Sequence, residues 1–147
     1  MEKNELLIFF VGTLITSAVG FILVLATDFG GFWAGYYGYV GFYVLLEAGS
    51  AFALIFLPEI IIFGFCIYLS TRVLMNLEAT PSEIQVKYGF YLSLVVVIMN
   101  IIGAIVFIIE LADTNWWFDA GFYGGLIGAL LTMLFLKFYL NNIKKSS

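Results

Sequence analysis

The chain has 147 residues, of which 63% are hydrophobic and only 11% charged, and its formal net charge is −4. Soluble domains are usually about half apolar and about a quarter charged, so this composition excludes an ordinary soluble domain. The absence of histidine also excludes histidine-based catalysis and histidine-ligated haem, and a single cysteine excludes an intrachain disulfide or a cysteine metal cluster.

Four apolar runs are long enough to cross a bilayer core of about 30 Å, which takes about 20 helical residues. The first run begins near the N-terminus, but it is longer than the apolar stretch of about 7–15 residues in a signal peptide, so we expect a retained helix. The sequence therefore predicts a single all-α transmembrane domain over residues 1–147, a four-helix bundle of two tandem helical hairpins with short loops. The predicted helices cover residues 6–27, 43–72, 87–110 and 121–140.

The positions of the basic residues predict how these helices are oriented. With four spans, all six cations fall near the termini or the central turn: Lys3, Arg72, Lys87, Lys137, Lys144 and Lys145. Cytoplasmic segments of membrane proteins carry the excess of lysine and arginine. We therefore expect both termini and the central turn in the cytoplasm, the other two connections outside, and the plasma membrane as the location.

The two outer connections contain a similar short sequence, WAGYYG at residues 33–38 and DAGFYG at residues 119–124. This similarity indicates a weak internal repeat in which each connection leads into the next helix. Aromatic residues gather in both connections and predict a belt at the membrane surface: Trp33, Tyr36, Tyr37, Trp116, Trp117 and Tyr123. Anchoring at the lipid interface is one interpretation of this belt, and a surface for a ligand or partner is the other.

Small residues recur at four-residue spacing in the first and last predicted helices, a pattern that lets two helix backbones approach closely. The glycines in this pattern are Gly12, Gly20, Gly121, Gly124, Gly125 and Gly128. Because the spacing puts them on one face of each helix, we expect these two helices to be in close contact. The pattern leaves open whether the contact lies within one chain or between two copies.

One polar residue falls near the middle of each predicted helix: Thr16, Glu59, Asn100 and Thr132. Glu59 lies 13 residues from Arg72, about 20 Å along a helix, and the other three lie equally far from a basic residue. A charged carboxylate in hydrocarbon is unfavourable, so we expect a neutral Glu59 that donates a hydrogen bond to Asn100. If the repeat is followed literally, the second helix begins near Tyr36 and Glu47 is the deep acid instead.

Two interpretations of the polar residues remain open. In the first, Glu59 and Asn100 are hydrogen-bonding groups that fix the register of the helices. In the second, Glu59 is a protonation or cation site on a transport path, which is the usual interpretation of an ionisable residue inside a membrane.

The sequence lacks a glycine-rich phosphate loop, a nucleophile elbow, a metal-ligand spacing and a basic cluster for nucleic acid. We therefore expect no enzymatic activity, no cofactor, no bound metal and no nucleic-acid partner. The expected function is that of a structural or accessory subunit or a self-associating scaffold, with the bilayer, further copies or other membrane subunits as partners. The alternative is an oligomeric proton- or cation-linked channel or transporter that uses Glu59.

Overall fold

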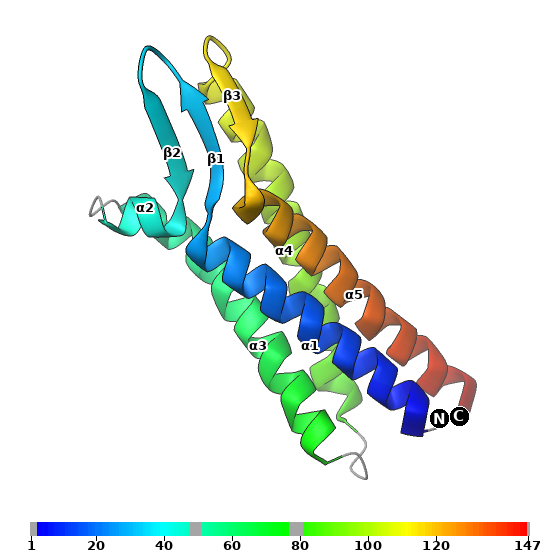
Figure 1. Cartoon of the computed structure of the whole chain (residues 1–147). Helices are drawn as coiled ribbons and strands as arrows, with labels where there is room; N and C mark the ends of the chain where they lie inside the picture. Colours follow the sequence, from blue (N-terminus) through cyan, green and yellow to red (C-terminus); the bar gives the residue numbers. More distant parts are fainter. Residues whose placement is uncertain (1–2, 48–50, 77–80, 147) are drawn as a thin grey trace.

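The computed structural model describes residues 3–47, 51–76 and 81–146 (Figure 1). Its long helices are α1 (Lys3–Ala26), α3 (Leu57–Met75), α4 (Glu83–Glu110) and α5 (Ala120–Ser146). Each of them is long and apolar enough to cross a membrane, and for α3 the span includes the turn before the helix. The four candidate spans are Asn4–Ala26, Leu54–Met75, Glu83–Glu110 and Ala120–Ile143. The prediction of a membrane protein with four spanning helices is confirmed at this level.

The long helices pack in the order α3, α1, α5, α4, since α1 has its largest contacts with α5 and α3, and α4 has its largest contact with α5. The start of α1, the end of α3, the start of α4 and the end of α5 lie together at one end of the bundle, which we call the terminal end (Figure 1). The shorter elements gather at the opposite end, which we call the sheet end.

The sheet end holds a small antiparallel sheet that the sequence analysis missed. Its strands are β1 (Asp28–Trp33), β2 (Tyr37–Gly41) and β3 (Asn115–Phe118), in the order β2-β1-β3. The prediction of an all-α chain with short loops is therefore wrong here, because the two connections pair their backbones with each other. Glycines in β1 allow this pairing under large rings: a Cβ on Gly30 would lie 2.7 Å from the Phe107 ring, and one on Gly31 would overlap the Trp117 ring.

The repeated sequence does not fold in the same way twice. WAGYYG contains the turn of the β1–β2 hairpin, where Gly35 has a φ of 81°, a left-handed conformation that glycine adopts without strain. DAGFYG instead begins α5, where the Asp119 carboxylate accepts a hydrogen bond from the Ala120 N–H at 2.7 Å. The predicted internal repeat is therefore wrong as a structural repeat.

The helix predicted over residues 43–72 is interrupted. α2 (Phe42–Glu47) and the 3-10 helix η1 (Ala51–Phe56) precede α3, which has Pro58 in its first turn. Proline suits a helix start because its missing N–H would have no helical partner there and its φ is already helical. Glu59 consequently lies in the first turn of α3 and not in the middle of a longer helix. Each of the other three helices extends three to six residues beyond its predicted bound at one end, and at the other end it differs from the prediction by one residue at most.

All six predicted packing glycines contact another element of the same chain: Gly12, Gly20, Gly121, Gly124, Gly125 and Gly128. Among the long helices, the closest backbone approach at a glycine joins α1 and α5, where a Cβ on Gly128 would lie 3.0 Å from the Gly20 Cα and 3.2 Å from the Thr16 carbonyl oxygen. Two helices approach this closely only when small residues face each other. The small-residue stripes therefore serve packing within the chain.

The contact between α5 and β1 predicts which glycine substitution destabilises the bundle. A Cβ on Gly121 would lie 2.6 Å from the Asp28 carbonyl oxygen, so Gly121→Ala forces backbone to move and we expect a loss of about 1–3 kcal/mol. Gly64→Ala is the matched control, because a Cβ there has no neighbour within 4 Å. Labelling of Cys66 by a maleimide dye on heating measures unfolding, since the chain's single cysteine is fully buried. Equal labelling midpoints for the two variants would contradict the prediction.

Candidate functional site

The four polar residues predicted in mid-helix form two hydrogen-bonded pairs. The hydroxyls of Thr16 on α1 and Thr132 on α5 lie 2.8 Å apart. On the other pair of helices, Asn100 Nδ2 donates to Glu59 Oε1 at 3.1 Å and to the Val96 carbonyl oxygen at 3.0 Å. The structure therefore brings together Glu59 of α3 with Asn100 of α4, and Thr16 with Thr132, but it does not join the two pairs.

The two pairs lie at different levels of the bundle. The prediction that all four polar residues lie equally deep, near the middle of their helices, is therefore wrong. Asn100 packs on Gly125, seven residues before Thr132 on α5, which is about 10 Å along the helix. The prediction fails because Arg72 and Lys87 lie three and four residues inside the ends of their helices. Counting from these two cations therefore places Glu59 and Asn100 too close to the terminal end.

Glu59 is only 5% exposed, and Asn100 is only 1% exposed. The hydrogen bond between them runs opposite to the predicted direction, because the Asn100 amide donates and the Glu59 carboxyl accepts. Asn100 Oδ1 is buried without a hydrogen-bond partner in the described part of the chain, and it faces the Gly125 position at 2.6 Å from where a Cβ would lie. No described lysine or arginine forms a salt bridge with Glu59. This carboxyl is therefore held by one amide and has no counter-ion within the described residues.

Glu59 also lines a groove of about 550 Å³ between α3 and α4 at the sheet end, which we call the carboxyl groove. This volume lies within the range of about 300–1,000 Å³ found for ligand sites. The residues that line the groove are Phe29, Val40, Leu45, Ile55, Phe56, Glu59, Met99, Ile102, Gly103, Val106, Phe107, Glu110 and Leu111. Apart from Glu59 and Glu110, these side chains are apolar.

The shape of the carboxyl groove follows from the local structure of α4. The lining residues from Met99 to Glu110 recur at three- and four-residue spacing, so they form one face of α4 that is about 16 Å long. Gly103 allows the Phe29 ring of β1 to lie close to this face, because a Cβ at Gly103 would be only 3.3 Å from that ring. Glu59 lies at the inner end of the groove, and the exposed Glu110 lies at the end of α4, beside the sheet.

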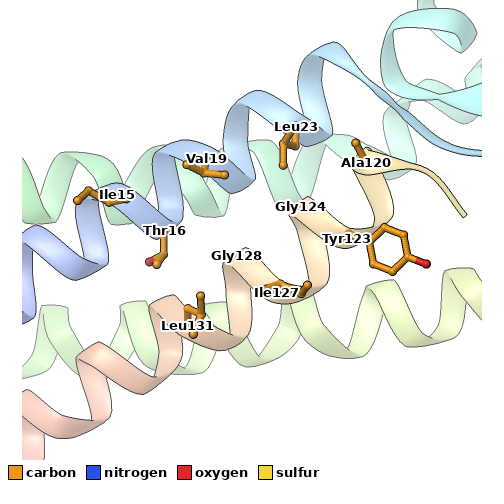
Figure 2. Close-up of a pocket in the computed structure, with 10 residues that line it drawn as sticks. All are labelled: Ile15, Thr16, Val19, Leu23, Ala120, Tyr123, Gly124, Ile127, Gly128 and Leu131. Carbon is orange, nitrogen blue, oxygen red and sulfur yellow. The ribbon is translucent and has the colours of Figure 1, made fainter.

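A second groove, of about 470 Å³, lies between α1 and α5, and Figure 2 shows side chains of both helices lining it. Its polar groups are not available to orient a ligand. The Thr16 hydroxyl is hydrogen-bonded to Thr132 and to the Gly12 carbonyl oxygen, and the Tyr123 hydroxyl points away from α1 (Figure 2). This groove therefore offers an apolar surface and no chemistry of its own.

The other predicted site residues lie at the sheet end. Glu47 ends α2, outside the four candidate spans, and its side chain lies outside the described residues. Of Glu47 and Glu59, only Glu59 lies within a candidate span. The predicted aromatic belt is divided between strands and a helix: Trp33, Tyr36, Tyr37 and Tyr123 are exposed, whereas Trp116 and Trp117 are half-buried on β3.

Two acids meet where β1 begins and β3 leads into α5. Partial burial raises the pKa of the Asp28 carboxyl above its ordinary value, and the neighbouring Asp119 carboxylate raises this pKa further. Asp119 is fixed in place, since its N–H donates to the Phe29 carbonyl oxygen at 3.0 Å. Within residues 3–47, 51–76 and 81–146, no three histidine, cysteine or acidic side chains are grouped so that they could hold a metal ion.

The chain matches no protein-family model, no curated protein and no solved structure. Any functional proposal therefore rests on the geometry of the grooves and of the sheet.

The raised pKa of Asp28 predicts a pH-dependent stability. The folded state binds the Asp28 proton more tightly than the unfolded state, so this contribution to stability is present below the ordinary pKa and is lost as the pH rises through the folded pKa. We expect Asp28→Asn to raise the midpoint of Cys66 labelling at pH 7 by about 1–2 °C, with the difference shrinking toward pH 4. Asp113→Asn, on the exposed turn after α4, controls for the loss of one negative charge. A difference that grows toward pH 4 would contradict the prediction.

Two isosteric substitutions test the polar contact between α3 and α4. Glu59→Gln keeps an oxygen that accepts the Asn100 hydrogen bond, so we expect stability within about 0.5 kcal/mol of the wild type. Asn100→Asp removes the amide that donates to both Glu59 and Val96, and we expect a loss of about 1–3 kcal/mol. Thermal labelling of Cys66 compares them, and a Glu59→Gln protein that is the less stable of the two would contradict this account.

Proposed function

We propose that this chain is a non-catalytic membrane protein that acts as an accessory subunit and binds a further membrane subunit or a second copy through its aromatic sheet. The observation that carries the proposal is the exposure of the hairpin tip, where Tyr36 is 64% and Tyr37 is 68% exposed. Tyrosine and tryptophan are enriched in protein interfaces because they combine a large apolar area with a polar group.

The position of the hairpin favours a protein partner over lipid anchoring. The β1–β2 hairpin extends beyond the end of α1 (Figure 1), and the six residues of β1 span about 20 Å. Aromatic residues that anchor a membrane protein sit at the level of the lipid headgroups, close to the helix ends. Trp33, Tyr36 and Tyr37 belong to the far end of the hairpin and are therefore better placed for contact with protein.

The packing of the glycines also bears on how partners are bound. Gly124 and Gly128 face Leu23 and the Gly20 backbone within the same chain, so the stripes that suggested self-association are already occupied. The sheet order β2-β1-β3 leaves β2 and β3 as the edge strands. A partner strand is able to pair with such an edge, and exposed aromatic side chains add contact area. These features support the sheet as the surface that binds partners.

A catalytic role is not favoured by the polar groups. The chain has no histidine, and the two acids of the carboxyl groove are separated by roughly 15 Å, the rise of ten residues on α4 between Asn100 and Glu110. The paired catalytic carboxyls of glycoside hydrolases, by comparison, lie about 5–10 Å apart. We further propose a plasma-membrane location with the sheet outside the cell, because all six basic residues lie toward the terminal end.

A second candidate function is a proton- or cation-linked conduit that uses Glu59. The observation that favours it is a buried carboxyl without a basic partner among the described residues, placed on the wall of a groove. Ionisable residues in such positions commonly belong to ion or proton pathways. Its first requirement is that a cation binds beside Glu59.

The accessory function predicts that assembly depends on the hairpin tip. Tyr36→Ser combined with Tyr37→Ser is expected to remove bound partners or copies in native mass spectrometry of the protein extracted in mild detergent. The bundle should stay intact, since both rings are exposed, and protection of Cys66 from maleimide verifies this. Tyr88→Ser, an equally exposed tyrosine near the start of α4, is the matched control and should keep the partners. A monomeric wild type, or a double variant that keeps its partners, would overturn the proposal.

A further inference from the structure

We propose that the carboxyl groove binds a hydrophobic organic cation, with its charged centre beside Glu59 and its apolar body between α3 and α4. The proposal requires binding and no flux, and it does not depend on the accessory function of the sheet.

The first observation is that no described basic residue neutralises the acid of the groove. Glu59 is 5% exposed and receives a hydrogen bond from Asn100, but no described lysine or arginine is paired with it. A carboxylate buried in an apolar groove is stabilised by a nearby positive charge, so a ligand that supplies one gains binding energy at this point. The second acid of the groove, Glu110, adds negative potential at the other end. Both charges therefore favour a cation and disfavour an anion.

The second observation is the aromatic lining. Phe29, Phe56 and Phe107 all line the groove, and the ring centroid of Phe29 lies 5.9 Å from those of the other two. The faces of aromatic rings attract cations, and this attraction is strongest where water is excluded. A carboxyl group together with several aromatic rings is a suitable environment for an organic cation with an apolar surface.

The spacing of the acids disfavours a calcium or magnesium site. Calcium and magnesium need about six oxygen ligands in one coordination shell. Glu59 of α3 is hydrogen-bonded to Asn100 of α4, and Asn100 lies ten residues before Glu110 on the same helix. The carboxyls of Glu59 and Glu110 are therefore separated by about 15 Å along the bundle. They cannot share one small ion. A larger ligand whose own body fills the apolar volume of about 550 Å³ satisfies both the lining and the charge.

The opening of the groove suits a ligand that arrives from the bilayer. Three lining residues, Ile55, Ile102 and Val106, are exposed apolar side chains on spanning segments. The groove therefore opens sideways, toward lipid, and hydrophobic cations concentrate in lipid. A lipid acyl chain would also fit an apolar groove, but it would gain nothing from Glu59 and would not discriminate between ligand charges.

Two ions of the same shape and opposite charge provide the test. We expect the purified wild-type protein to bind tetraphenylphosphonium saturably in equilibrium dialysis, and to bind tetraphenylborate at least about tenfold more weakly. Glu59→Gln, which keeps the Asn100 hydrogen bond, should weaken tetraphenylphosphonium binding by about tenfold or more and should not weaken tetraphenylborate binding. Equal affinity for the two ions, as an acyl-chain groove would give, overturns the proposal, as does a Glu59→Gln protein that binds the cation as tightly as the wild type.

A second pair of variants keeps the test decisive if Glu59→Gln fails to fold. Val106 lines the groove and is 52% exposed, so Val106→Trp fills the groove from the lipid side without disturbing the core. Val95→Trp is the matched control, because Val95 is also exposed on α4 but does not line the groove. Binding of tetraphenylphosphonium should be lost in the first variant and kept in the second. Retained binding in Val106→Trp would place the ligand elsewhere and overturn the proposal.

Discussion

The close approach of α1 and α5 at Gly20 and Gly128 determines where the other helices lie. A Cβ on Gly128 would meet the Gly20 backbone, so these two helices are nearer to each other than larger side chains would permit. The hydrogen bond between Thr16 and Thr132 lies beside this contact and fixes the relative height of the two helices. α3 then packs on α1, and α4 packs on α5, while the contact between α3 and α4 is the smallest of the four around the bundle.

The carboxyl groove is a consequence of this arrangement. Toward the terminal end, the buried side chains of Cys66, Leu69 and Val86 belong to one cluster and fill the space between α3 and α4. At the sheet end, α3 has only begun, and Gly103 of α4 offers no side chain to the gap. The rings of Phe29 and Phe107 close the space from the side of the sheet, so what remains is a groove with Glu59 at its inner end.

Hydropathy and side-chain size allow the spanning helices and their closest contact to be predicted from the sequence, because lipid imposes long apolar runs and small residues permit close packing. The start of α3 was missed, since the run from Tyr36 to Met75 is predominantly apolar and only Pro58 marks the boundary. The sheet was missed for a different reason. Strands β1 and β3 are far apart in the chain, and glycine-rich aromatic segments are equally typical of membrane-surface turns.

The sequence identifies the polar residues of the candidate site but does not predict the groove that they line. A carboxyl group in an apolar helix is conspicuous in any sequence, and its pairing with Asn100 follows from the scarcity of polar partners. The groove beside Glu59 depends instead on the helix start at Leu57, which only Pro58 marks, and on the position of the Phe29 ring on β1, which has no local signal.

The sheet and the groove share residues, which connects the two proposed activities. Phe29 of β1 and Val40 of β2 line the carboxyl groove, while the same hairpin carries Tyr36 and Tyr37 at its tip. A partner that shifts the hairpin therefore moves two walls of the groove. Thermodynamic linkage makes this coupling reciprocal. If the partner changes the affinity of the groove for its ligand by some factor, the ligand changes the affinity of the sheet for the partner by the same factor. An accessory subunit built in this way would respond to hydrophobic cations in the surrounding bilayer through the hairpin itself.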